Sequence, residues 1–469
     1  MADIICLKFD TIPLLNYYLR IHPIIHSPAI ISFSTMRRAL AGILILAMIL
    51  ITIINSFVTI SISFNPLWLA GISGWLAALL LFPDTPRILK VQVGILILIG
   101  LGLIFYSSSQ GISIDLNSII SGNTGLLAMI AAVGFLKLVV IPDTATQRPL
   151  PVGKSSYLQT LIGLNLSASI INISAPIMIA DRIHHQRPLQ RFTSQSFTRV
   201  FCGVASWSPF FGAMAVVLTY VSDAQLSWII VAGLPFTIAG FVVVYAEARL
   251  RYPEQVNDFV GYPMQISSLK VPALLVLSVV IAAWLLADTP VLVVIASCAL
   301  LVTVVTLLFR TTINWTLRHL IDYIVNGLPR MVNELTLFLA AGVLAAGMSA
   351  MIVNGALANP FVVFDALTAS KLLGIIVILA AIGIHPVILI TSFTPLMLAL
   401  DPDPNLLAVT YLFAWNLGTC SSPLSGTHLV FQGRYGLPSW KAAIWNWPYA
   451  VVMWLIALAW LQVVEAFLP

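Results

Sequence analysis

The chain of 469 residues is 60% hydrophobic and only 8% charged, and its mean hydropathy is +1.02. This composition excludes a soluble globular domain and predicts an all-α polytopic membrane protein. The net charge of +5 does not indicate nucleic-acid binding, because the basic residues lie in short loops between apolar segments. The four cysteines lack metal-ligand spacing and no Gly-rich phosphate loop is present. We therefore expect no metal site, no cofactor and no ATP-driven pump.

Residues 1–38 are mixed in composition, and we expect an N-terminal extension or cytoplasmic segment there. Stretches apolar and long enough to enter or cross a bilayer follow at about 39–63, 67–83, 92–107, 124–141, 157–181, 197–221, 226–246, 271–287, 290–309, 331–357, 372–400, 405–432 and 443–463. Residues 311–328 mix aromatic, charged and apolar side chains, which is typical of a helix lying at the membrane interface.

Two of the apolar stretches turn polar partway and contain a proline. In 157–181, Asn172 and Ser174 precede the proline, and in 372–400, Ser392 and Thr394 precede it. We interpret both stretches as re-entrant helical hairpins, each of which enters and leaves the bilayer on one side. If each hairpin makes no net crossing and the N-terminus is cytoplasmic, nearly all loop Lys and Arg residues lie on the cytoplasmic side, as the positive-inside rule requires.

A second pair of motifs follows the hairpins. Residues 203–212 and 418–426 carry Gly, Ser and Pro in the middle of an apolar span, and such residues break a helix. Hydroxyls and freed backbone groups at such breaks suit a small ion, and the N-terminus of the resuming helix suits an anion. The alternative is an ordinary proline kink between packed helices. The candidate substrate- or ion-binding residues at the two breaks are Ser206, Ser208, Gly212, Ser421, Ser422 and Gly426.

The duplicated motifs predict two inverted repeats. We expect scaffold helices in 39–112; repeat 1 in 113–246, with a hairpin at about 157–181 and a broken helix at about 197–221; a linker with scaffold helices and the interfacial helix in 247–325; and repeat 2 in 326–466, with a hairpin at about 372–400, a broken helix at about 405–432 and a final span at 443–463.

Few ionisable residues fall inside the predicted spans. His385 and His428 are candidate proton carriers, because histidine titrates near neutral pH, although a packed and hydrogen-bonded histidine is the alternative. Lys137 is expected to snorkel to the membrane surface, and Glu334 is expected at the inner interface. No buried carboxylate pair is visible in the repeats, which counts against a cation–proton antiporter.

The order of hairpin, proline and broken span, repeated twice, resembles the ion-transporter superfamily, which includes divalent-anion/sodium symporters and the arsenite and sodium–proton antiporter branches. The symporters carry Ser-Asn-Thr at both hairpin tips, whereas this chain has Asn-Ile-Ser and Ser-Phe-Thr, so it looks like a divergent member. By this resemblance, Asn172, Ser174, Ser392 and Thr394 match hairpin-tip positions, and the serines and glycines of the breaks match the other binding positions. The resemblance also implies an elevator mechanism on a homodimeric scaffold.

The sequence therefore predicts a non-enzymatic secondary transporter in the cytoplasmic (inner) membrane. It would move a small, anionic solute, with Na⁺ or H⁺ as the coupling ion. The alternatives are an arsenite-like exporter or a cation/proton antiporter of the same superfamily, or a membrane scaffold or enzyme. The expected partners are the small-molecule or ion substrate, the lipid bilayer and a second copy of the chain, with no nucleic acid.

Overall fold

The computed structural model describes residues 33–58, 65–112, 114–139, 150–262, 270–353 and 359–468, and these ranges consist of helices joined by short loops. Eight helices in this described part are long and apolar enough to cross a membrane. This confirms the predicted fold class, a polytopic helical membrane protein. Of the expected N-terminal segment 1–38, residues 1–32 lie outside the described part.

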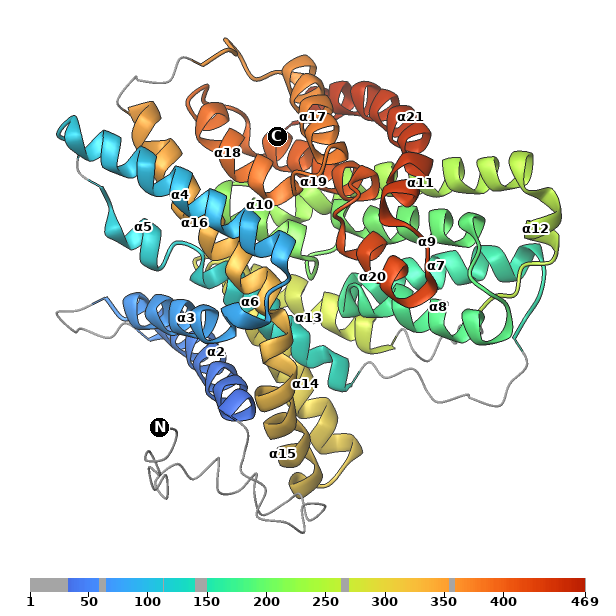
Figure 1. Ribbon diagram of the computed structural model, residues 1–469, viewed down its shortest axis with the longest axis horizontal. Coiled ribbons are helices and arrows are strands. Elements are labelled where there is room, and N and C mark those ends of the chain that lie inside the picture. Colours follow the sequence, from blue (N-terminus) through green and yellow to red (C-terminus); the bar gives the residue numbers. More distant parts are fainter. Residues whose placement is uncertain are drawn as a thin grey trace, which may run out of the picture.

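One group of helices comes from the predicted scaffold segments and the first span of each predicted repeat (Figure 1). Helix α2 packs on α3, α4 runs along α16, and α14 packs against α6. Small residues permit such close approaches: a Cβ atom on Gly100 of α4 would lie 2.8 Å from the backbone nitrogen of Leu344 in α16. The group comprises α2 (Phe33–Phe57), α3 (Leu67–Leu81), α4 (Arg87–Ser109), α5 (Leu116–Ile120), α6 (Thr124–Gly134), α13 (Lys270–Leu285), α14 (Val291–Arg310), α15 (Ile313–Asp322) and α16 (Val332–Val353).

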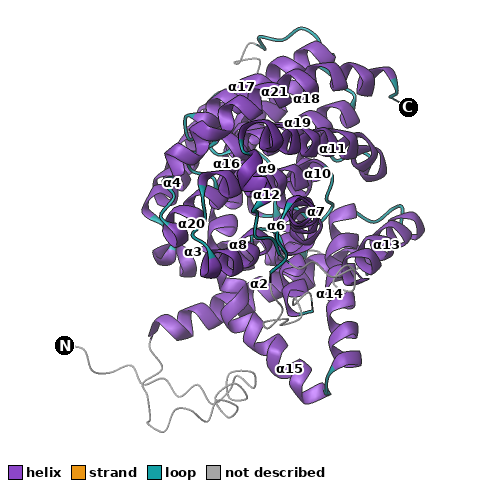
Figure 2. Ribbon diagram, turned by 90° about the vertical axis from the view of Figure 1, so that its right-hand side faces the viewer, coloured by secondary structure: helices purple, strands orange, loops and turns teal. Residues whose placement is uncertain are grey.

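Short 3-10 segments continue two of these helices: η2 (Phe135–Leu138) follows α6, and η6 (Leu328–Met331) precedes α16. Helix α15 extends from the edge of the helical body (Figure 2), and Thr316 is its one buried residue. An exposed, mixed surface of this kind fits the interfacial helix expected at 311–328. Its placement relative to a bilayer stays a prediction.

The described helices include a pair at the first predicted hairpin and a break within the first predicted broken helix, while the re-entrant placement of the pair in a bilayer stays a prediction. Helix α7 (Lys154–Ile171) turns at Asn172 into α8 (Ser174–Gln186), and α9 (Arg191–Gly203) with η3 (Val204–Ser206) is separated by a break from α10 (Gly212–Tyr220). Helix α8 has 13 residues. At about 1.5 Å per residue it is roughly 20 Å long, too short to cross a hydrocarbon core of about 30 Å. Helices α11 (Leu226–Arg251) and α12 (Pro253–Asn257) follow.

The same order of elements recurs in the C-terminal part. Helices α17 (Ala366–Ala381) and α18 (Pro386–Leu398) form a hairpin, α19 (Pro404–Ser421) and α20 (Gly426–Tyr435) form a broken helix, and α21 (Ser439–Ala466) ends the series. The two long helices that close the series also correspond. Pro235 lies nine residues after the first residue of α11, and Pro448 lies nine residues after the first residue of α21.

The tip of the second hairpin differs from the expectation. Ser392 and Thr394 are predicted at the tip, but both lie inside α18, where each hydroxyl donates to the carbonyl four residues earlier. The prediction of their tip position is therefore wrong. The chain reverses at Gly383 instead, because glycine accepts its φ of 106° and Pro386 can begin a helix but not continue one.

Helix α11 packs directly on the first break. A Cβ atom on Gly233 would lie 1.7 Å from the carbonyl oxygen of Ser206. Only glycine allows this approach, because the obstructing atom belongs to the backbone and cannot rotate away.

We expect Gly233→Ala to destabilise the protein by about 1 to 3 kcal/mol, because α11 must move away from the break. Thermal melting of the purified protein in detergent measures this loss. The matched control is Gly94→Ala in α4, where a Cβ atom would have no neighbour within 4 Å. Equal melting temperatures for the two variants would contradict the packing described here.

Candidate functional site

The two breaks have the same local structure. At the first, the hydroxyl of Ser208 accepts a hydrogen bond from the amide of Phe210 at 3.2 Å, and the Ser208 carbonyl accepts one from Phe211 at 3.3 Å. At the second, the hydroxyl of Ser422 accepts from Leu424 at 3.3 Å, and its carbonyl accepts from Ser425 at 3.2 Å. Each break is thus a Ser-Pro turn, in which proline takes the second position and the serine side chain caps the turn.

Both hairpin turns contact the second break. A Cβ atom on Gly426, the first residue of α20, would lie 3.3 Å from Cδ1 of Ile173 in the first turn. A Cβ atom on Gly383, in the second turn, would lie 3.4 Å from Cδ1 of Leu424. The segment between α19 and α20 therefore lies between the two turns.

The first break contacts the first half of the other broken helix. The side-chain amide of Asn416 in α19 donates to the hydroxyl of Ser206 at 3.0 Å, and both residues are buried. The hydroxyl of Ser208 donates to the carbonyl of Ser169 in α7 at 2.7 Å. The two breaks and the two hairpin turns thus converge, as the predicted location of the site requires.

Several buried side-chain oxygens of α19 and α20 make no hydrogen bond with any described residue. They are the Asn416 side-chain carbonyl and the hydroxyls of Thr419, Ser421 and Thr427. Buried oxygens without partners carry a desolvation cost, and clustered hydroxyl and carbonyl oxygens are suitable ligands for Na⁺.

A buried polar network joins the two broken helices to the helices that follow them. Arg199 of α9 is 4% exposed, forms an ion pair with Glu247 of α11 and donates to the Asn446 side-chain oxygen at 2.8 Å. It also donates to the carbonyl of Trp445 at 3.2 Å and lies 4.8 Å from the ring centre of Tyr449. One cation thus connects α9, α11 and α21.

The same network indicates which ring nitrogen of His428 carries the proton. Arg199 can only donate, so the Asn446 oxygen faces Arg199 and the Asn446 amide nitrogen faces Nε2 of His428, at 3.3 Å. Nε2 must then accept, while Nδ1 donates to the Ser422 carbonyl at 2.8 Å. This arrangement favours a neutral, structural histidine that holds α20 against the break, and proton transfer by His428 stays a prediction.

His385 has a local role. It precedes α18, its Nδ1 accepts from the amide of Val387 at 3.2 Å, and its ring meets Trp415 edge-on at 5.6 Å between ring centres. The side chain therefore caps α18 at the turn of the second hairpin.

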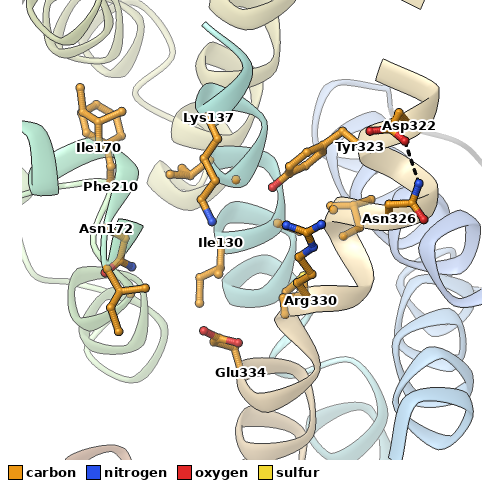
Figure 3. A pocket seen from close by; sticks show the side chains of 18 residues that line it. Ile130, Lys137, Ile170, Asn172, Phe210, Asp322, Tyr323, Asn326, Arg330 and Glu334 are labelled. Carbon is orange, nitrogen blue, oxygen red and sulfur yellow. Dashed lines mark hydrogen bonds between the residues drawn. The ribbon is translucent and has the colours of Figure 1, made fainter. Parts of the chain in front are cut away.

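A cavity of about 230 Å³ adjoins the first hairpin turn and the first break. Figure 3 shows Lys137, Arg330 and Glu334 directed into this space from one side, with Asn172 on the other side. Asn172 has a φ of 51°, a conformation that asparagine tolerates better than most residues. Gly212, the first residue of α10, also lines the cavity.

A second cavity, of about 470 Å³, lies at the other ends of α6 and α16. Asn123 and Gly342 line it, and so does Thr394 of α18. Along the two helices the cavities are separated by the buried side chains of Leu127, Leu335 and Phe338.

The predicted site residues thus fall into three groups. Ser206, Ser208, Ser421, Ser422, Gly426 and His428 lie at or beside the two breaks; Asn172 and Gly212 line the smaller cavity, with Ser174 two residues from Asn172; and Ser392, Thr394 and His385 lie in or before α18. That these residues bind a solute or an ion stays a prediction.

Sequence reasoning missed four functional candidates. Lys137 is expected at the membrane surface and Glu334 at the interface, and Arg199 and Arg330 are not among the predicted site residues. Their shared feature in the sequence is a charge at or near the end of an apolar segment, and an ionisable residue that falls within the membrane marks a functional position by default.

The protein is similar in structure to the YdaH transporter of Alcanivorax borkumensis, with 15% sequence identity, coverage of 75% of this chain and 85% of that chain, and a TM-score of 0.40. At this level of similarity no substrate and no residue role carries over. No family model matches the chain, and no curated protein matches it.

We expect Arg199→Met to lower the stability by about 3 to 5 kcal/mol, because Glu247 loses a buried partner. The double variant Arg199→Met/Glu247→Gln should recover part of the loss, which thermal melting of the purified variants measures. Arg251, the other partner of Glu247, is 62% exposed. Arg251→Met is therefore the control and should cost about 1 kcal/mol or less. A double variant no more stable than the single one would contradict the pairing.

Proposed function

We propose that the chain is a secondary active transporter that carries a small anionic solute across the cytoplasmic membrane, coupled to Na⁺ or H⁺. One observation carries the proposal: two Ser-Pro breaks of the same structure converge with two helical turns. Freed backbone groups at membrane depth must face protein, water or a ligand, so paired breaks are typical of transporter sites.

The class of solute follows from the helix ends. Helices α10 and α20 begin at the breaks, at Gly212 and Gly426, and their first amide groups present partial positive charge. Lys137 and Arg330 add two cations beside the first break. These features support an anion over a neutral or cationic solute.

The mechanism we propose is an elevator. The Arg199 network ties α9, α11, α20 and α21 into one unit, which would slide with the hairpins against the scaffold helices of a homodimer. The two cavities at opposite ends of α6 and α16 support access from two sides in turn. The recurring order of elements, together with the charge bias of the loops, supports inverted repeats.

Single cysteines test the inverted arrangement. Cys202, Cys298 and Cys420 are buried, so a Cys6→Ser protein serves as the background. We expect Arg187→Cys and Lys441→Cys to react with an impermeant maleimide from the cytoplasm, and Asp223→Cys and Val362→Cys from outside, because the positive-inside rule orients the loops this way. Val362 is 94% exposed. Labelling of positions 187 and 362 from the same side would rule out the arrangement.

Uptake into proteoliposomes tests the site, with succinate, citrate and sulfate as probes and with or without Na⁺. Ser208→Ala and Ser422→Ala should each raise the solute concentration that gives half-maximal uptake about fivefold, because one hydrogen bond of about 1 kcal/mol is lost. Gly426→Val should reduce uptake further, because its side chain would press on Ile173.

Ser278→Ala is the control for the uptake experiment. Ser278 lies in α13, and its hydroxyl donates to the carbonyl of Leu274 within the same helix. Loss of uptake in this variant, with normal uptake in both break variants, would show that the site does not lie at the breaks. Absence of uptake of every probe by the unmodified protein would count against the proposed function itself.

A further inference from the structure

The smaller cavity brings together charges that lie far apart in the sequence. Lys137 comes from η2, Arg330 from η6 and Glu334 from the first turn of α16, and all three are exposed to the cavity (Figure 3). Among the described residues, none of the three makes an ion pair. Their side chains are therefore not held by a direct ion pair, although Lys137 and Glu334 attract each other electrostatically.

Two cations and two carboxylates line the cavity, but one carboxylate lies apart from the other charges. That carboxylate, Asp322, accepts a hydrogen bond from Asn326 at 2.7 Å, and Figure 3 shows it on the far side of Tyr323 from the other charges. Two cations and one carboxylate then remain beside the turn of the first hairpin. The carboxylate matters chemically, because an ionised Glu334 has no proton to donate and therefore only accepts hydrogen bonds.

The wall opposite the three charges comes from the predicted transport unit. Asn172 offers an amide at the hairpin turn, and Gly212 begins α10, whose N-terminus adds partial positive charge. A solute in this space would thus contact the scaffold helices on one side and the hairpin and break on the other. The volume of about 230 Å³ suits a small metabolite.

We propose that this cavity binds a small organic acid that carries a hydrogen-bond donor. Lys137 and Arg330 bind its carboxylate groups, and Glu334 accepts a hydrogen bond from its hydroxyl or ammonium group. The substrate class that we name here rests on the proposed function, but binding to the cavity can be tested without transport. It assigns Glu334 the selection of hydroxy or amino acids over plain dicarboxylic acids.

Three probes separate these roles: succinate, malate with an added hydroxyl, and aspartate with an added ammonium group. Calorimetry on the purified full-length protein measures their binding. The unmodified protein should bind malate or aspartate at least threefold more tightly than succinate. Lys137→Met and Arg330→Gln should weaken binding of all three acids at least tenfold, because each removes a cation. Glu334→Gln should abolish the preference and leave succinate binding intact or tighter.

Two variants separate binding from folding. Lys137→Arg keeps the charge and should retain binding within about threefold. Lys371→Met removes an exposed lysine of α17 that does not line the cavity, and it should bind all three acids normally. The melting temperatures of all variants should stay near that of the unmodified protein.

The proposal is overturned if Lys137→Met and Arg330→Gln bind the acids normally, if Glu334→Gln keeps the preference, or if the unmodified protein binds none of the three. Binding lost in Lys137→Arg as well, with the melting temperature unchanged, also overturns it. Uptake in proteoliposomes distinguishes this failure from failure of the proposed function. Binding without uptake counts against transport alone, whereas uptake unaffected by Lys137→Met counts against the cavity alone.

Discussion

Backbone hydrogen bonding in an apolar environment is the constraint on which this structure depends. A helix interrupted inside a bilayer leaves amide and carbonyl groups that lipid cannot satisfy. This chain meets the constraint twice in the same way: Ser208 and Ser422 each cap a turn with the side chain and close it with the carbonyl. The turns also require neighbouring helices that approach closely, which explains why Gly233 of α11 lies against the first break.

The network around Arg199 follows from the same constraint. Breaking two helices weakens the segments on either side, so the half-helices need contacts with other helices. Arg199 holds α9 through three donated contacts to α11 and α21, and Asn446 of α21 also contacts His428 of α20, beside the second break. A buried cation with fully paired partners adds little net stability, but it specifies one arrangement, which we regard as its purpose here.

The sequence was most informative where local chemistry decides the structure. Both breaks lie within the ranges that the Ser-Pro motifs predicted, 203–212 and 418–426, because proline and glycine act on the backbone beside them. The second hairpin shows the limit: Ser392 and Thr394 resembled a polar tip, but a hydroxyl can also bond within a helix, and Gly383 decided the turn. The cluster of Lys137 and Glu334 could not be predicted, because tertiary packing alone brings these segments together.

The two cavities differ in charge, and the difference bears on coupling. The smaller is lined by Lys137 and Arg330 together with the carboxylates of Glu334 and Asp322, whereas Asp115 is the one charged residue among those that line the larger. An anion held by the two cations at the smaller cavity would therefore meet no cation at the larger one. Its binding free energy would then differ between the states of the transporter that open to each cavity. A coupled cation bound by the unpartnered oxygens at the second break would offset this difference, since it moves positive charge with the solute. Under the proposed mechanism, the hydroxyls of Ser421 and Thr427 would thus bind the coupling cation while Lys137 and Arg330 bind the solute.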